Sequence, residues 1–347
     1  MVTIADVAKA AGVSVATVSR VMNGSASVAE PTAQVVRAAI ERLAYIPNQQ
    51  ARNLRRSESR VILVLMPNIT NPYYANVFSG INERAKELGY TLFLCNTEGR
   101  EPEKVLREAT EGKRCDGVIL LQIQYNDEWL QKYTKQIPIV QCCEYTGYGD
   151  IPHITVDNYK AAYEATEYLI RLGHRNIGTI SAANNMVSTI QRMRGYRDAL
   201  HDAGLRSGEG SVTYADENYG YKSSLQAARW LLTMPNRPTA VFCISDAIAL
   251  ATVVAAGELG IRVPQDLSIV GFDDVIYTQM FHPYLTTVIQ PCAALGSQAM
   301  ELLHELIVRG EISNPCVTLP HGFIVRESTG VLAQSAMNPY FPASAVK

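Results

Sequence analysis

Long hydrophobic runs are absent from this sequence of 347 residues. The longest purely aliphatic run, from Val61 to Met66, is far too short to form a transmembrane helix. The N-terminus also lacks the apolar stretch of a signal peptide, because Asp6 and Lys9 interrupt the place where it would lie. We therefore expect a cytoplasmic protein without a membrane-spanning segment.

Catalytic and metal-binding motifs are absent as well. The sequence contains no HExxH, GxSxG or Walker A pattern, and no GxGxxG follows a predicted strand. The 6 histidines are scattered without ligand spacing, and His174 is expected to be structural. The 7 cysteines form no CxxC pair, and most lie in apolar runs typical of buried, reduced thiols. We expect neither an enzyme nor a metal or other cofactor.

The charge is small overall but unevenly distributed. Hydrophobic residues make up 47% and charged residues 18%, which excludes disorder for most of the chain. Residues 1–60 carry a net charge of +4, and the remaining residues carry −6, which together give the formal charge of −2. A basic head on an acidic body indicates an anionic partner for the head.

The basic head has the pattern of short helices. Thr3 and Asp6 predict a capping box at the start of a first helix, and Gly12 ends that helix. Ser14 can cap a second helix that runs to about Met22. Apolar residues with a period of 3.6 predict a third helix over residues 32–43.

Two short helices joined by a tight turn form a helix-turn-helix, whose second helix can enter the major groove of DNA. On that second helix, Val15 and Ala16 suit the methyl group of thymine, and Arg20 suits a guanine edge. The hydroxyls of Thr17 and Ser19 suit phosphates. The alternative is a three-helix bundle without a nucleic-acid role.

After Arg60 the pattern changes to strands that alternate with amphipathic helices, which predicts parallel sheets. The expected strands are residues 61–66, 91–95, 117–121, 137–142, 177–180, 239–243 and 267–270. The expected helices are residues 74–88, 101–113, 159–172, 190–203, 220–233 and 246–259. This stretch exceeds one typical α/β sheet, so we expect two similar lobes.

Several motifs in order resemble the lactose/galactose repressor (LacI/GalR) family of bacterial transcription regulators. The head "TIADVAKAAGVSVATVSRVMNG" is followed by "NQQARNLRRSESRVILVLMPNITNPYY", "YLIRLGHRNIG", "RMRGYRDAL", "PTAVFCISDAIALA" and "VPQDLSIVGFDDVIYTQMFHPYLTTVIQP". The resemblance covers about residues 2–330. In places, as in "PIVQCCEY", it is greatest to the cytidine-repressor branch.

The resemblance implies further contacts with DNA. In the family, a hinge helix folds on the operator and inserts a leucine into the minor groove; Leu54, with Ala51 and Arg55, matches that pattern. We also expect Thr3 and Asn23 at the DNA. The alternative for the hinge is an ordinary flexible linker.

The body resembles periplasmic sugar-binding proteins, in which ligands lie beyond the carboxyl ends of strands, in a cleft between lobes. Residues just past expected strand ends are the candidates: Tyr73, Tyr74, Glu144, Ser245, Asp246, Asp273 and Asp274, with Gln122 and Gln124 less favoured. The resemblance adds Arg192 as a ligand-binding arginine and Tyr219 as an aromatic lid. Such a set suits a sugar or a nucleoside as effector.

Each of these residues also has a structural alternative. The two tyrosines could be core aromatics, Arg192 a surface residue and Asp273 a helix cap.

The expected fold is thus α/β, with an N-terminal all-α helix-turn-helix head and a two-lobed, periplasmic-binding-protein-like body with parallel sheets. We place the head at residues 1–47, the hinge at 48–59, the body at 60–330 and a disordered tail at 331–347. The first lobe takes about residues 60–158 and 291–320, and the second about 159–290 and 321–330.

The expected function is that of a transcriptional regulator, most simply a repressor, which binds a palindromic operator in double-stranded DNA and responds to a small effector. Two heads on a palindrome require a homodimer. Pro339 and Pro342 exclude a C-terminal heptad seam that would make a tetramer. The alternative is a solute-binding protein for sugar or nucleoside uptake, which would share the body fold.

Overall fold

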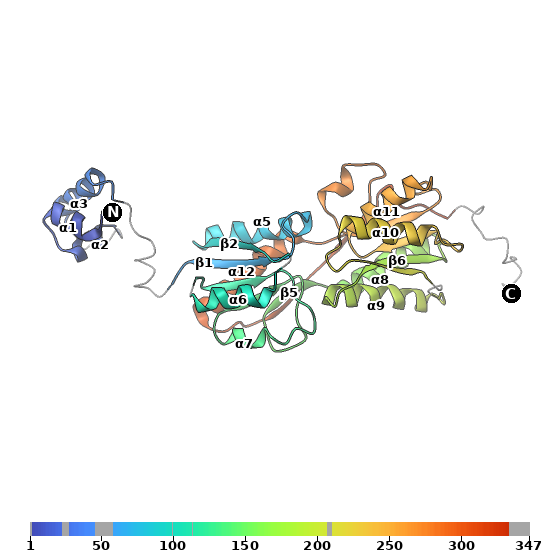
Figure 1. Cartoon of the computed structure of the whole chain (residues 1–347), viewed down its shortest axis with the longest axis horizontal. Coiled ribbons are helices and arrows are strands. Elements are labelled where there is room, and N and C mark those ends of the chain that lie inside the picture. Colours follow the sequence, from blue (N-terminus) through green and yellow to red (C-terminus); the bar gives the residue numbers. More distant parts are fainter. Residues whose placement is uncertain are drawn as a thin grey trace, which may run out of the picture. The chain divides into compact units, whose positions relative to one another are not determined.

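The computed structural model describes residues 2–22, 28–45, 58–98, 100–112, 114–206 and 210–332. The chain divides into two compact units, residues 1–59 and residues 60–347. The first unit contains the helical head, and the second contains two α/β lobes (Figure 1). The predicted fold class is confirmed. The predicted hinge helix and C-terminal tail fall largely outside the described residues.

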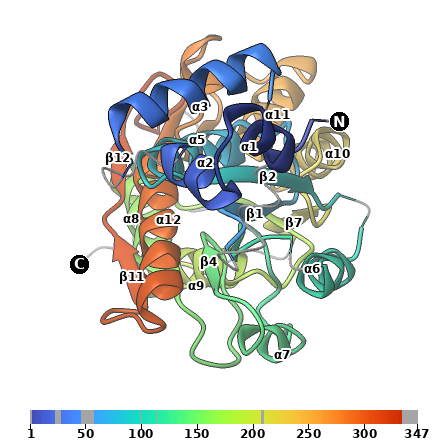
Figure 2. The same cartoon turned by 90° about the vertical axis from the view of Figure 1, so that its left-hand side faces the viewer.

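The head consists of α1 (Ile4–Ala11), α2 (Val15–Met22) and α3 (Glu30–Arg42), which pack around a small core (Figure 2). The capping box of Thr3 and Asp6 is present, and Gly12 ends α1 in the left-handed conformation that glycine allows, with φ 66°. The third helix begins two residues earlier than predicted, because Pro31 is well tolerated in a first turn.

The first lobe contains a six-stranded sheet with parallel pairing throughout. Across the sheet its strands are β11 (Cys316–Leu319), β5 (His153–Val156), β4 (Ile139–Cys142), β3 (Gly117–Leu120), β1 (Val61–Met66) and β2 (Thr91–Asn96). One face packs against α5 (Pro72–Glu87) and α12 (Cys292–Arg309). The other face packs against α6 (Pro102–Glu111) and α7 (Gln131–Thr134).

The second lobe repeats this plan. Across its sheet the strands are β12 (Gly322–Ile324), β10 (Thr286–Ile289), β9 (Ser268–Asp273), β8 (Ala240–Cys243), β6 (Ile177–Ala182) and β7 (Val212–Ala215). Only β12 runs antiparallel to its neighbour within this sheet. Its helices are α8 (Asn158–Arg171), α9 (Val187–Asp202), α10 (Tyr221–Leu232) and α11 (Asp246–Glu258), and a short 3-10 helix, η1 (Ile276–Gln279), follows β9.

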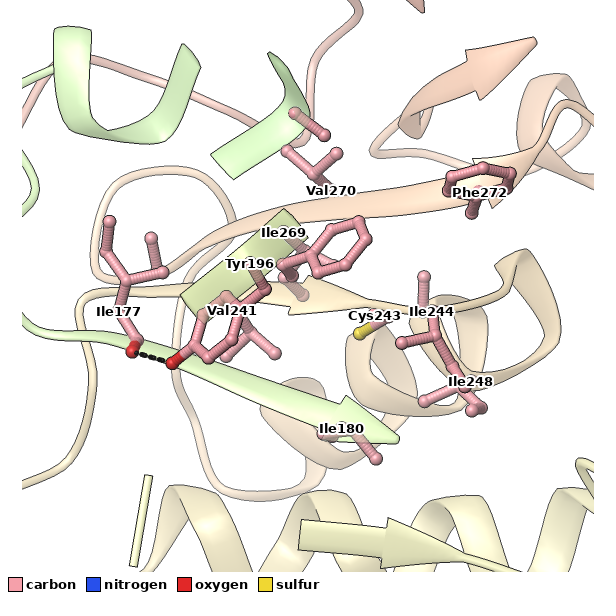
Figure 3. Packing of buried hydrophobic residues seen from close by; sticks show 14 of the residues in the cluster. Ile177, Ile180, Tyr196, Val241, Cys243, Ile244, Ile248, Ile269, Val270 and Phe272 are labelled. Carbon is pink, nitrogen blue, oxygen red and sulfur yellow. Dashed lines mark hydrogen bonds between the residues drawn. The ribbon is translucent and has the colours of Figure 1, made fainter. Parts of the chain in front are cut away.

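The core of the second lobe lies between this sheet and its helices. Figure 3 shows Tyr196 of α9 beside Val241 of β8, where its hydroxyl donates a hydrogen bond of 2.8 Å to the carbonyl oxygen of Ile177. In Figure 1, α8 and α9 lie on one side of the strands, and α10 and α11 lie on the other. Gly195 lets α9 approach α8 closely, since a Cβ there would lie 2.3 Å from the carbonyl oxygen of Tyr159.

The chain crosses between the lobes three times: from β5 to α8, from β10 to α12 and from β11 to β12. These crossings position the loops that follow the strands, where the predicted effector residues lie.

The alternation of strands and helices was predicted, but five strands were not. They are β5, β7, β10, β11 and β12, each of only three or four residues. Four residues are too few to show a period, and three of these strands lie at sheet edges where their residues are partly exposed. The long helix α12 was also missed.

His174 and the cysteines have the environments of structural residues. His174 is 2% exposed, and its ring nitrogens lie 3.0 Å from Thr239 Oγ1 and 2.9 Å from Ser268 Oγ. Five cysteines are buried, as expected. Cys316 is exposed on the edge strand β11, so the expectation of a buried thiol is wrong for that residue. Among the described residues, no helix has the length and apolarity to cross a bilayer, and no cluster of three potential metal ligands occurs.

Candidate functional site

The second helix of the head presents one side to its own core and another outward. Val18 is fully buried among α1 and α3, whereas Ala16 and Arg20 are exposed. Val15 is half-buried and packs on the head's core, so it is less exposed than predicted, and its contact with a thymine methyl stays a prediction. It precedes Val18 by three residues and therefore shares its helix face.

The hydroxyl residues of the head have local structural partners. The Thr3 hydroxyl donates a hydrogen bond of 2.7 Å to Asp6 Oδ2 and caps α1. Ser14 caps α2 by accepting a hydrogen bond of 3.1 Å from the backbone N–H of Thr17, whose own hydroxyl lies 2.9 Å from Ser14 Oγ. Ser19 is half-buried.

Four of the residues predicted to contact DNA lie outside the described residues, and their predictions stay predictions: Asn23, Ala51, Leu54 and Arg55.

Several residues predicted to bind an effector come together at the carboxyl ends of the strands of the second sheet. Asp273 is the last residue of β9, and Ser245 and Asp246 begin α11 after β8. Arg192 on α9 points its guanidinium at the same place, with Nη1 4.0 Å from Asp273 Oδ1. We call Glu144, Arg192, Asp246 and Asp273 the charged cluster; all four are at least nine-tenths buried.

Arg192 is held by the protein itself. Its Nε donates to Asn158 Oδ1 at 2.8 Å, and its Nη1 donates to the carbonyl oxygen of Ile244 at 2.6 Å. The guanidinium stacks over the ring of Phe272 at 3.6 Å, which is a favourable cation–π distance. The expectation of a surface arginine is therefore excluded, since this side chain is fixed and buried.

Two carboxyl groups from neighbouring strand ends share this region. Asp246 accepts hydrogen bonds from the backbone N–H of Val275 at 2.9 Å and from the hydroxyl of Thr287 at 2.6 Å. Burial raises the pKa of Asp246 well above its usual range, and the negative charge of Asp273 raises it further. Burial also raises the pKa of Asp273, although Arg192 and Gln290 oppose this effect.

Glu144, which follows β4, connects the first lobe to the second. Its carboxylate accepts a hydrogen bond of 3.1 Å from the backbone N–H of Ser188, in the first turn of α9, and a second, short one from the Ser188 hydroxyl. Burial raises the pKa of Glu144 to about 6, although Ser188 and Arg192 both lower it. The carboxylate thus lies at the N-terminus of a helix of the other lobe, where the helix dipole favours negative charge.

The tyrosines of α5 lie against the same region from the first lobe. Tyr73 donates a hydrogen bond of 3.3 Å to Gln290 Oε1, and Gln290 Nε2 donates one of 2.7 Å to Asp273 Oδ1. Tyr73 and Tyr74 are buried and meet edge to face at 5.2 Å. Burial raises the pKa of Tyr74, and Tyr219 and Glu144 raise it further. Both tyrosines are thus core aromatics that also border the charged cluster.

Tyr219 and Ser245 have weaker links to the cluster. The Tyr219 hydroxyl lies 3.3 Å from Thr189 Oγ1, and the negative charge of Glu144 raises its pKa in addition to burial. Ser245 is the N-cap of α11 and accepts a hydrogen bond of 3.3 Å from the backbone N–H of Ile248. Gln124 instead bridges the lobes, because its Oε1 accepts from the backbone N–H of Asn185 at 2.8 Å.

Unusual backbone conformations gather at this place. Among the described residues, six non-glycine residues have positive φ, and four of these are in or next to the predicted site: Cys143, Tyr219, Asp273 and Asp274. Such conformations cost about 1–3 kcal/mol each and tend to persist at functional sites. Their concentration supports a functional role for these strand ends.

An open pocket of about 470 Å³ lies elsewhere in the first lobe. It is bordered by α7, by the start of β4 and by the end of α12, and includes Lys135 and Asp150. None of the predicted effector residues lines it.

Sequence reasoning missed several residues that hold the site together. Asn158 and Ser188 stand in the first turns of α8 and α9, and Gln290 follows the short strand β10. Asn158 and Gln290 follow β5 and β10, two strands that were not predicted, so their positions past a strand end were not recognised. Ser188 contacts the site by receiving Glu144 from the other lobe, which no sequence signal shows. Asp246, in contrast, was among the candidates, because it directly follows Ser245 just past the end of a predicted strand.

Two family models match the chain in separate regions. Residues 3–48 match "Bacterial regulatory proteins, lacI family", and residues 166–329 match "Periplasmic binding protein-like domain". The first match covers α1 to α3, and the second covers most of the second lobe, including Arg192, Asp246 and Asp273.

Relatives match over almost the whole length. Catabolite control protein A of Priestia megaterium is 35% identical over 94% of this chain and 99% of its own. The transcriptional repressor PurR of Yersinia enterocolitica is 38% identical over 89% of this chain and 91% of its own.

Solved structures of other regulators are also similar to this chain over nearly its whole length. The lac repressor dimer bound to operator and the anti-inducer ONPF gives a TM-score of 0.85 at 28% identity, covering 96% of this chain and 99% of that one. The regulator CelR in complex with cellobiose gives 0.72 at 31% identity, covering 94% and 100%. With relatives above 30% identity along nearly the entire chain, this protein belongs to the lacI family of bacterial regulatory proteins.

Proposed function

We propose that this protein is a transcriptional repressor that binds a palindromic operator as a homodimer and changes its affinity for that operator when a small effector binds at the charged cluster. The observation that carries this proposal is the combination of a lacI-family head with a two-lobed body in one chain. The relatives named as repressors and the lac repressor dimer on its operator support it.

In the head, α2 is the recognition helix. The exposed Ala16 and Arg20 provide a small apolar contact for a thymine methyl and a bidentate donor for guanine. Thr3, Thr17 and Ser19 contribute phosphate contacts that fix the position of the helix. We keep the proposal that Leu54, with Ala51 and Arg55, opens a central base step from the minor groove, and that Asn23 adds a contact.

In the body, the effector is a sugar or a nucleoside. Its hydroxyl groups pair with Arg192 and with the carboxylates of Asp273 and Glu144, while Tyr73, Tyr74 and Tyr219 supply apolar faces. Ser245 holds the start of α11 in place beside them. Because Glu144 and Gln290 already connect the two lobes, a ligand here changes their relative position and so the geometry of the dimer.

Such a protein acts in the cytoplasm, at DNA. The alternative, a solute-binding protein for uptake, shares the body but has no use for the lacI-family head, and we do not favour it.

A gel-shift titration with the promoter DNA that adjoins the protein's own gene tests the proposal. We expect a discrete complex at low concentration that competitor DNA of random sequence does not remove. Equal affinity for promoter and random DNA would contradict operator recognition and leave the solute-binding alternative in its place.

A further inference from the structure

The charged cluster contains more negative than positive groups. Three carboxyl groups, those of Glu144, Asp246 and Asp273, are 6%, 0% and 8% exposed, whereas Arg192 is the single basic side chain of the cluster among the described residues. The half-buried Arg326 donates a hydrogen bond of 2.7 Å to Asp274 Oδ1. The site therefore has no cation left over for an anionic ligand.

Two of the three guanidinium nitrogens of Arg192 already donate hydrogen bonds within the protein. Its Nε and Nη1 donate to Asn158 and to the carbonyl oxygen of Ile244, and its plane lies against Phe272. A phosphate is held best by a guanidinium that offers two parallel donors. One parallel pair of donors would include Nε, which donates to Asn158 at 2.8 Å, and the other would include Nη1, which donates to Ile244 at 2.6 Å and lies 4.0 Å from Asp273 Oδ1.

Helix N-termini are the second common device for binding phosphate, and three of them point to this region. Each is occupied by a side chain of the protein. The N-terminus of α9 holds the Glu144 carboxylate, and α11 begins with Asp246 itself, which Ser245 caps. The N-terminus of α5 is capped by Asn71, which accepts a hydrogen bond of 3.0 Å from Tyr73.

We propose that the effector carries no phosphate or carboxylate group, so that the site accepts a free sugar or nucleoside and rejects the phosphorylated form of the same molecule. This inference rests on the proposed function, because it concerns the ligand of the same site. Burial raises the pKa of all three carboxyl groups, and the charge of Asp273 raises the pKa of Asp246 further, so a further anion would enter a region in which solvent hardly screens negative charge.

Isothermal titration calorimetry of the full-length dimer tests the inference with ligand pairs that differ by one phosphate. The pairs are glucose and glucose 6-phosphate, ribose and ribose 5-phosphate, cytidine and cytidine monophosphate, and adenosine and adenosine monophosphate. For any pair that binds, we expect the free form to bind about 50-fold tighter or more, as like charges several ångströms apart repel at an effective dielectric constant near 20. A phosphorylated ligand that binds as tightly as its free form, or more tightly, would overturn the inference.

A matched pair of variants removes one negative charge inside or outside the cluster. Glu144→Gln keeps a side chain that can bond Ser188, and we expect it to reduce the preference for the free ligand by about fivefold. Glu108→Gln makes the same change on the exposed surface of α6 and should leave the preference unaltered. If Glu144 had a purely structural role, Glu144→Gln would weaken the binding of the free and the phosphorylated ligand equally. An unchanged ratio of these two affinities would therefore contradict the electrostatic argument.

The same calorimetry distinguishes a failure of the proposed function from a failure of this inference. If no free or phosphorylated member of any pair binds, the proposed sugar or nucleoside effector is wrong, and the inference falls with it. Selective binding of a phosphorylated member would leave an effector-controlled regulator in place and refute only the charge selection.

Discussion

Replacing Glu144 by Gln should stabilise the body at neutral pH, although it removes a carboxylate that accepts two hydrogen bonds. The carboxylate is buried at 6% exposure, and its pKa rises from 4.5 to about 6 in the folded chain. The folded state therefore holds the proton more tightly than the unfolded state does. The stability that the protonated Glu144 side chain contributes to the folded state is complete below pH 4.5 and is lost as the pH rises through 6.

The magnitude follows from the same values. A difference between 4.5 and about 6 corresponds to about 2 kcal/mol, because each tenfold change in proton affinity is worth about 1.4 kcal/mol. Gln cannot ionise, so the variant is free of this penalty. Relative to the wild type, the variant should gain about 2 kcal/mol as the pH rises from 3 to 8, and about 1 kcal/mol of this gain falls between pH 5 and pH 8. Any loss from poorer hydrogen bonding to Ser188 adds an offset that does not depend on pH.

Urea unfolding followed by tryptophan fluorescence measures this difference, because the two tryptophans, Trp129 and Trp230, both lie in the body. Glu108→Gln on exposed α6 is the control and should track the wild type at every pH. A stability difference that stays constant from pH 5 to pH 8 would refute the reasoning. So would one that shrinks as the pH rises, since it would mean that Arg192 and the α9 N-terminus more than offset the burial of the charge.

Three further changes test other parts of the structure. Gly195→Ala should destabilise the body by about 1–3 kcal/mol or more, because its Cβ would meet the backbone of α8 at Tyr159; thermal unfolding at an unchanged midpoint would contradict the close packing. His174→Ala should cost about 1–3 kcal/mol, since it removes a buried imidazole that lies within hydrogen-bond distance of Thr239 and Ser268; a loss below 1 kcal/mol in urea unfolding would argue against it. Arg20→Ala should weaken operator binding by about 1–3 kcal/mol and relax specificity at one position per half-site; equal weakening on random DNA would show a phosphate contact instead.

Much of the fold was predictable because its signals are local. The buried strand β1 is a continuous apolar run, and both bounds agree with the prediction. Gly12 and Ser14 mark the turn of the head by their own conformational preferences, and the structure has both in those roles. Short edge strands such as β7 and β12 carry too few residues for a period, so their existence depends on neighbours that the sequence alone does not place.

The candidate site was predictable in part for a different reason. Asp273 and Glu144 follow buried strands, and the geometry of parallel sheets brings such residues together. Arg192 was predicted only from the resemblance to the repressor family, since the sequence of its helix gives no reason to expect a buried cation. Gln290 and Ser188 were not predicted because their roles depend on contacts between distant elements of the chain. Gln290 links Tyr73 to Asp273, and Ser188 donates a hydrogen bond to Glu144 of the opposite lobe.

In the proposed mechanism, one effector, bound at the charged cluster, controls the affinity of the head for DNA. Thermodynamic linkage makes this control directly measurable, because the factor by which the effector changes operator affinity must equal the factor by which operator changes effector affinity. Fluorescence anisotropy with labelled promoter DNA and calorimetry with the tightest-binding free sugar or nucleoside give the two factors. We expect equal factors of about 5 to 150 in the wild type and a factor near one for the effector on operator affinity in Asp273→Ala. A factor of one in the wild type, with both ligands bound, would contradict the account.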